Sequence, residues 1–101
     1  SEAEAAFRRS IAVNPDYGDA HVNLAAMLLS KGRAKEAIPH FERAVALNPG
    51  SAGMHSNLGG ALAFIGRYQE AMVEIRRALD LDPNHAPALD NLRRLQRMGI
   101  R

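Results

Sequence analysis

The sequence contains no cysteine, and it has few aromatic residues, two tyrosines and three phenylalanines. The absence of cysteine excludes disulfides and thiolate metal sites. No apolar run approaches the roughly 18 residues that a membrane-spanning helix needs, and no basic segment followed by an apolar one marks a secretory signal at the N-terminus. We therefore expect no membrane partner.

The chain also lacks an excess of one sign of charge, because the formal net charge is only +2 over 101 residues. With 47% apolar and 24% charged residues, the composition is that of one soluble globular domain. The composition does not fix a compartment, and our expectation is a soluble, cytoplasmic protein. The chain begins with serine rather than methionine, so we expect a piece of a longer or processed protein whose function lies partly outside it.

A period of 34 residues organises what is present. Three Asn-Pro or Asp-Pro steps recur at this interval, and so do three asparagines within near-identical hexamers. Superposing residues 18–51 on 52–85 aligns apolar, small and polar residues along the whole segment. The aligned residues include Pro15, Pro49 and Pro83; Asn23, Asn57 and Asn91; His21 and His55; Leu24 and Leu58; Gly32 and Gly66; Glu36 and Glu70.

Each period predicts two helices joined by a short turn. Apolar residues at spacings of three and four predict helices over residues 19–31, 34–47, 52–65 and 68–81, with breaks at Gly32 and Gly66. Ser51 and Asn84 are expected to cap the helices that follow them. Small residues such as Ala25 and Gly59 let helix axes approach closely. Gly59 and Gly60 each lower helix propensity by about 1 kcal/mol, which indicates a place that requires close backbone approach.

The two ends differ from the full periods. Residues 1–13 read as a second helix without its first, with Ala3, Ala6, Phe7 and Ile11 on one face. Such a face exposes apolar surface and predicts association with another repeat or another copy. Residues 86–98 read as a capping helix with a Leu89, Leu92 and Leu95 stripe. We expect one domain over 1–101, divided into a truncated repeat (1–17), two repeats (18–51 and 52–85) and a cap (86–101).

These motifs resemble the tetratricopeptide repeat, whose 34-residue pattern carries W-x2-L-G-x2-Y, A-x3-F and a terminal proline. The first full period gives His21-x2-Leu24-Ala25-x2-Leu28, Ala37-x3-Phe41 and Pro49, and the second gives His55-x2-Leu58-Gly59-x2-Leu62, Ala71-x3-Ile75 and Pro83. The resemblance implies an all-α solenoid of antiparallel helix pairs, with about six helices. It also implies that the first helix of each pair lines a concave groove.

No arrangement of residues predicts catalysis, a metal or a cofactor. His55 and Ser56 are neighbours and point roughly 100° apart on a helix, with no carboxylate at helical spacing beside them. His21 and His55 lie on equivalent helices at least roughly 8 Å apart, too far to share a zinc ion, and we interpret both as packed residues. The basic cluster of the last helix suits the negative end of its dipole, and without interleaved aromatics nucleic acid is not expected. That cluster comprises Arg93, Arg94, Arg97 and Arg101.

The recurring asparagines are the candidate binding residues. An asparagine amide both donates and accepts, so it can bond the backbone of an extended peptide without reading its side chains. Asn23, Asn57 and Asn91 are similar to the asparagine ladder of O-linked N-acetylglucosamine transferases, and that resemblance implies a polypeptide partner. Ala26, Gly60 and Arg94 share their helix face, and Phe64 is the expected apolar anchor. Further candidates for specificity are Asp19, Val22, Ser30, Ser56, Asp90 and Met98.

Family members that hold the C-terminal carboxylate of chaperones use lysine, asparagine and arginine at positions that here are Val22, Ala26, Pro87 and Asn91. We therefore expect no binding of chaperone tails. The sequence favours a non-catalytic module that binds an extended peptide segment. Two alternatives stay open: a homo-oligomer assembled through the N-terminal helix, or the substrate-holding part of a larger enzyme such as a glycosyltransferase.

Overall fold

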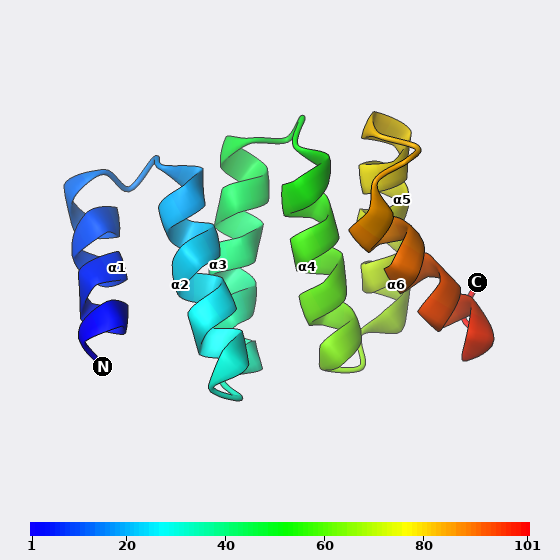
Figure 1. Ribbon diagram of the computed structural model, residues 1–101, viewed down its shortest axis with the longest axis horizontal. Coiled ribbons are helices and arrows are strands. Elements are labelled where there is room, and N and C mark those ends of the chain that lie inside the picture. Colours follow the sequence, from blue (N-terminus) through cyan, green and yellow to red (C-terminus); the bar gives the residue numbers. More distant parts are fainter.

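The computed structural model describes residues 1–101 and consists of six helices without a strand. Figure 1 shows the helices following one another in chain order in two layers, one behind the other, with the last helix oblique to the rest. The molecule measures 40 × 27 × 18 Å. The all-α solenoid that the sequence predicts is confirmed. The helices are α1 (Glu2–Val13), α2 (Gly18–Ser30), α3 (Ala34–Leu47), α4 (Ala52–Phe64), α5 (Tyr68–Leu81) and α6 (Ala86–Arg97).

The turns within the pairs use glycine in the left-handed region. Gly32 and Gly66 follow α2 and α4 with φ of 76° and 85°, a conformation that residues with a Cβ rarely adopt. The next residue then closes the helix end, as where the Arg33 N–H donates to the Leu28 carbonyl at 2.8 Å. The helix breaks that the sequence predicts at these glycines are therefore present.

One of the two predicted N-terminal caps is wrong. The Ser51 hydroxyl accepts from the Met54 N–H at 3.2 Å, as expected. Asn84 does not cap α6, because the chain turns first and its backbone N–H donates to Asp82 Oδ1 at 3.2 Å. His85 is the residue before α6 and makes no capping bond with its side chain. Asp82 thus stabilises the turn that precedes the helix.

The core runs between the two helix pairs, α2 with α3 and α4 with α5. Its largest fully buried side chains are Leu24, Leu28, Ile75 and Leu95. Gly59 marks a close approach of α4 to α5, because a Cβ atom there would lie 2.8 Å from Ile75 Cγ1 and 3.2 Å from the Ala71 carbonyl oxygen. The expectation that Gly59 permits close packing is confirmed. No helix has the length and apolar character required to cross a membrane.

The first and last helices are less buried than the four between them. No residue of α1 is buried; Phe7 and Ile11 are half-buried against the core, while Ala3 and Ala6 are exposed. In α6 Leu95 is buried as predicted, whereas Leu89 and Leu92 are only half-buried and Ala88 takes the other buried position.

An ionic cluster joins α1 to the end of α2. Glu4 binds Arg33 at 2.8 Å and Lys31 at 3.4 Å. Hydrogen bonding from Arg33, assisted by Arg8 and Lys31, lowers the pKa of Glu4 from 4.5 to about 2. A carboxyl group whose folded-state pKa is depressed contributes stability above its unfolded pKa and loses that contribution as pH falls. The attachment of α1 therefore weakens between pH 4.5 and about 2.

We predict that α1 detaches from α2 across this acid window before α4 and α5 unfold. Amide hydrogen exchange followed by NMR should show α1 losing protection in this window ahead of α4 and α5. Glu4→Gln should produce the weakened attachment already at neutral pH, because the amide carries no charge. Glu2→Gln is the matched control, since Glu2 is exposed and makes no ion pair. Uniform loss of protection in α1, α4 and α5 of the wild-type chain would contradict the prediction.

Candidate functional site

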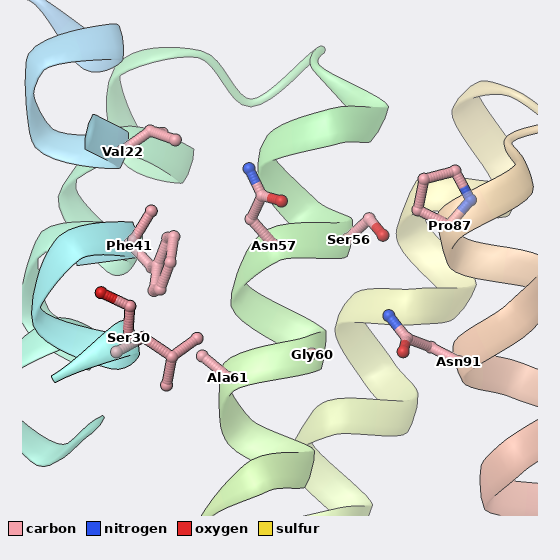
Figure 2. A pocket seen from close by; sticks show the side chains of 11 residues that line it. Val22, Ser30, Phe41, Ser56, Asn57, Gly60, Ala61, Pro87 and Asn91 are labelled. Atoms are coloured by element: carbon pink, nitrogen blue, oxygen red, sulfur yellow. The ribbon is translucent and has the colours of Figure 1, made fainter. Parts of the chain in front are cut away.

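A hollow of about 390 Å³ opens across the first helices of the pairs (Figure 2). Its walls come from α2, α4 and α6, and one side chain of α3 reaches it from the second layer. Because each helix presents one face every three to four residues, the lining positions recur at that spacing. The lining residues are Val22, Ala26, Leu29, Ser30, Phe41, Ser56, Asn57, Gly60, Ala61, Pro87 and Asn91.

Two of the three predicted asparagines belong to this hollow. In Figure 2 the amide of Asn57 points from α4 toward α2, and the amide of Asn91 points from α6 toward α4. Asn57 is exposed and Asn91 is half-buried. Neither side chain makes a hydrogen bond within the chain. Both amides can therefore donate to and accept from a ligand without giving up an internal partner.

Gly60 keeps the space beside Asn91 open. A Cβ atom at Gly60 would lie 3.4 Å from Asn91 Nδ2, and nothing else lies within 4 Å of it. A larger side chain would therefore occupy the hollow without disturbing the core. The two adjacent glycines of α4 differ in this respect, because Gly59 faces α5 and Gly60 faces the hollow.

A smaller hollow of about 180 Å³ continues past Gly60 and Asn91, which line both. The expected anchor Phe64 lines this second hollow and is 69% exposed, so its ring is available to a ligand. Arg94 and Met98 also lie there, as do Ala63, Tyr68 and Leu95.

Three predicted residues line neither hollow. Asn57 and Asn91 point toward the first helix of the preceding pair, whereas α2 has only α1 before it. Asn23 on α2 is exposed and lines neither hollow. Asp19 and Asp90 are likewise exposed outside both hollows. Ala26, Ser30, Ser56 and Val22 are in the first hollow as predicted.

Four lining residues of the first hollow were not predicted as candidates: Leu29, Phe41, Ala61 and Pro87. Phe41 belongs to the A-x3-F motif; it is only 3% exposed, yet it borders the hollow between α2 and α4. Pro87 lies at the start of α6. Its position is equivalent to that of Asp19, two 34-residue periods earlier. The same spacing that selected Asp19 would have found Pro87.

The two histidines are buried, as predicted, but they are not simply packed. His55 Nε2 bonds the Pro49 carbonyl at 2.7 Å, and its Nδ1 meets Glu74 Oε1 at 2.9 Å. Arg77 binds the other carboxylate oxygen of Glu74 at 2.8 Å. As the spacing predicts, α4 itself places no carboxylate beside His55, but Glu74 reaches the ring from α5, a helix that spacing along α4 does not reveal. Ser56 takes no part in this network.

His21 stands in the equivalent place of the first pair with a different partner. Its Nε2 bonds the Pro15 carbonyl at 2.8 Å, and its Nδ1 lies 3.3 Å from His40 Nδ1. The two rings are stacked with centroids 5.6 Å apart. Each pair is thus joined to the loop before it by a histidine side chain.

The chemistry of the first hollow is uncharged. None of its eleven lining residues is ionisable, and the amides and serine hydroxyls are its polar groups. No group of three or more histidine, aspartate or glutamate residues is close enough together to hold a metal ion. Such a surface can bond a neutral peptide backbone and bury small apolar side chains.

Stacked helix pairs with a groove along the first helices define a helical-repeat solenoid, a class of protein whose concave face is a binding surface. A family model described as tetratricopeptide repeat matches residues 28–95, and a second with the same description matches residues 1–52. The chain belongs to the tetratricopeptide repeat family. Members of this family are generally non-catalytic interaction modules. The chain matches no curated protein.

Solved structures with the same fold include three of particular interest. A mutant of the Thermobaculum terrenum O-GlcNAc transferase is 33% identical over 84% of this chain, with a TM-score of 0.79. The first repeat domain of Spaghetti (RPAP3), bound to the HSP90 peptide SRMEEVD, is 25% identical over 96%, with a TM-score of 0.90. YrrB, described as having an unusual peptide-binding site, is 24% identical over 86%, with a TM-score of 0.80.

The aligned part is a small fraction of the first of these proteins. This chain spans 16% of the transferase, 77% of the RPAP3 chain and 45% of YrrB. The likeness to YrrB concerns the fold alone.

Proposed function

We propose that the chain binds an extended segment of another protein in the groove, with Asn57 and Asn91 bonding the backbone of that segment. The observation that carries the proposal is the pair of unbonded amides facing one uncharged hollow. Backbone amides of an extended peptide need alternating donors and acceptors, and an asparagine side chain supplies both. The peptide complex of the similar RPAP3 domain supports the use of this fold for such a ligand.

The groove selects against a chaperone-type carboxylate. Positions that hold cationic or amide clamp residues in chaperone-binding relatives are Val22, Ala26, Pro87 and Asn91, and all four line the first hollow. A carboxylate placed there would lose water without gaining a cation. The proposed ligand is therefore an internal, uncharged stretch of polypeptide, with Phe64 contacting an apolar side chain at one end. Asn23 contributes only to a segment long enough to pass α2.

Removal of the amides tests the proposal. We predict that Asn57→Ala and Asn91→Ala each weaken binding about tenfold, because each loses up to two hydrogen bonds of about 1 kcal/mol. The ligand would be a twelve-residue peptide selected from a random displayed library on the wild-type chain, and fluorescence anisotropy would give Kd. Helix content should not fall, because alanine has the higher helix propensity.

Asn84→Ala is the matched control, because Asn84 is exposed in the loop before α6, away from the hollow. Unchanged affinity in the Asn57→Ala, Asn91→Ala double variant would refute the backbone role of the amides. Failure of the library to yield any groove-binding peptide would refute the binding function itself.

The likeness to the transferase favours a second candidate, in which the groove is the substrate-holding part of a larger enzyme. The mode of binding is then the same, and the ligand is the polypeptide to be modified. Assembly through α1 is the weaker alternative, since Phe7 and Ile11 already pack against the core and mainly alanines remain exposed on that face.

A further inference from the structure

The two helix pairs carry the same side-chain contact with different chemistry. His21 meets His40 across the first pair, and His55 meets Glu74 across the second, each at a sequence separation of 19. The period of 34 relates His40 to Glu74. In both pairs the histidine also bonds a proline carbonyl of the preceding loop through Nε2. We call the His21–His40 contact the first junction and the His55–Glu74 contact the second. The two differ in one partner, His40 in place of Glu74.

Hydrogen-bond roles fix where the protons lie in the first junction. A carbonyl oxygen only accepts, so His21 Nε2 must carry its proton and bond Pro15. In a neutral ring His21 Nδ1 is then an acceptor, and His40 Nδ1 must be the donor to it. A further proton at His40 Nε2 would keep this bond but would place a charge on a half-buried ring close to His21 and Arg8. A proton at His21 Nδ1 would set two N–H donors against each other. The junction is therefore most stable while both rings are neutral.

The second junction has the opposite requirement. Glu74 offers a carboxylate oxygen to His55 Nδ1, and the Pro49 carbonyl accepts from Nε2. Both ring nitrogens therefore face acceptors, so a doubly protonated imidazole satisfies both bonds. Arg77 holds the carboxylate from its other side. Protonation of His55 therefore keeps both bonds of this junction.

We propose that the first helix pair is an acid-release device: mild acidification opens the His21–His40 junction and frees α2 and the loop before it from α3, while the His55–Glu74 junction keeps the second pair closed. The device acts on the groove, because Val22 and Ala26 of α2 form one of its walls.

The surroundings of His40 support this direction. Its half-buried position, then the neighbouring His21 and the charge of Arg8 on α1, hold the pKa of His40 below its usual 6.5, against the smaller opposing effect of Glu36 on α3. A histidine with a depressed folded-state pKa contributes its full stability above 6.5. Because the unfolded chain then binds more protons, stability is lost as pH falls below that value.

Charged groups around the second junction are of both signs. Arg77 and Asp80 of α5 border the same hollow as His55, and Glu42 of α3 and Glu70 of α5 lie on the other side of Glu74. At the first junction the positive charge of Arg8 disfavours a charged ring at His40. The two junctions therefore differ in their surroundings as well as in their partners.

Hydrogen exchange of the whole chain, resolved by NMR, tests the device at about pH 7.5 and about pH 5.5, on either side of the usual histidine pKa. After correction for intrinsic exchange rates, the opening of α2 should increase about tenfold, while α4 and α5 change much less. Equal responses in both pairs, or none in α2, would overturn the proposal.

Reciprocal substitutions move the response. His40→Glu should give the first pair the chemistry of the second and abolish its acid response, and Glu74→His should confer that response on α4 and α5. His40→Gln, whose amide donates without titrating, should also abolish it. His85→Gln is the control, because His85 lies in a different loop next to Asp82. An acid response that persists in His40→Gln would overturn the proposal.

The wild-type chain gives an independent answer if a variant fails to fold. Imidazole 15N chemical shifts report which ring nitrogen carries the proton. At about pH 7.5 we expect the Nε2–H form for His21 and the Nδ1–H form for His40. The Nδ1–H form of His21 would overturn the proposal, since the junction would then lack its acceptor.

Discussion

Gly59→Val is expected to lower the free energy of unfolding by about 3 kcal/mol, at the upper end of the usual range for overpacking. The first added carbon would lie 2.8 Å from Ile75 Cγ1 and 3.2 Å from the Ala71 carbonyl oxygen. The side chain of Ile75 has no free space because it is fully buried, and the backbone of α5 cannot retreat without opening the core. Valine gains little helix propensity to offset this strain. Urea unfolding followed by circular dichroism would measure the loss.

The neighbouring glycine provides the control. Gly60→Ala should leave stability unchanged or raise it by up to about 1 kcal/mol, since its Cβ meets only Asn91 Nδ2, at ordinary contact distance. The two substitutions change adjacent residues of one helix, yet only Gly59→Val should lower the urea midpoint. A Gly59→Val midpoint equal to wild type would show that α4 and α5 are not in such close contact.

Glu74→Ala has the second-largest expected effect, a loss of about 3 kcal/mol, the lower end for removing one partner of a buried ion pair. The Glu74 side chain is 10% exposed and joins His55 to Arg77, so its removal leaves a buried ring nitrogen without a partner. The loss stays at the lower end because Arg77 is 60% exposed and can turn to water. Thermal and urea unfolding should agree on the decrease.

Glu70→Ala tests whether the loss of any ion pair would lower the free energy of unfolding as much as Glu74→Ala. Glu70 pairs with Arg67, but the Glu70 side chain is 58% exposed. Surface pairs contribute about 0–1 kcal/mol, so this variant should be close to wild type. Glu74→Gln keeps an acceptor for His55 and should fall between the two. Equal losses in Glu70→Ala and Glu74→Ala would contradict the assignment of a buried junction.

Local signals were enough to predict the helices. Their bounds follow from apolar spacing and from Gly32 and Gly66, and both kinds of signal are determined by residues within one turn of each other. The wrong prediction at Asn84 also concerns local structure. The side-chain oxygens of Asp82 and Asn84 both lie near the start of α6, and the geometry of the turn makes Asp82 the acceptor within that turn and leaves Asn84 without a capping bond. Sequence spacing does not report that geometry.

Contacts between helices account for what the sequence could not predict. Glu74 lies beside His55, and Phe41 borders the groove, through the packing of second helices on first ones. The period brought Asn57 and Asn91 to one hollow, since it repeats the face of each first helix. The period could not show that Asn23 lies outside the hollow. Whether Asn23 lines a hollow depends on which helix precedes α2 rather than on the face of α2 itself.

The bond from a histidine ring to a proline carbonyl acts on the step between one helix pair and the next. His21 and His55 make this bond, whereas Leu89 holds the equivalent position in α6, the helix that lies most obliquely in Figure 1. A small rotation at such a step is carried to every helix beyond it, and its displacement grows with distance. These two hydrogen bonds therefore lie at the points about which one helix pair would rotate relative to the next. A small change of angle at either point would displace the far end of the molecule by a larger distance.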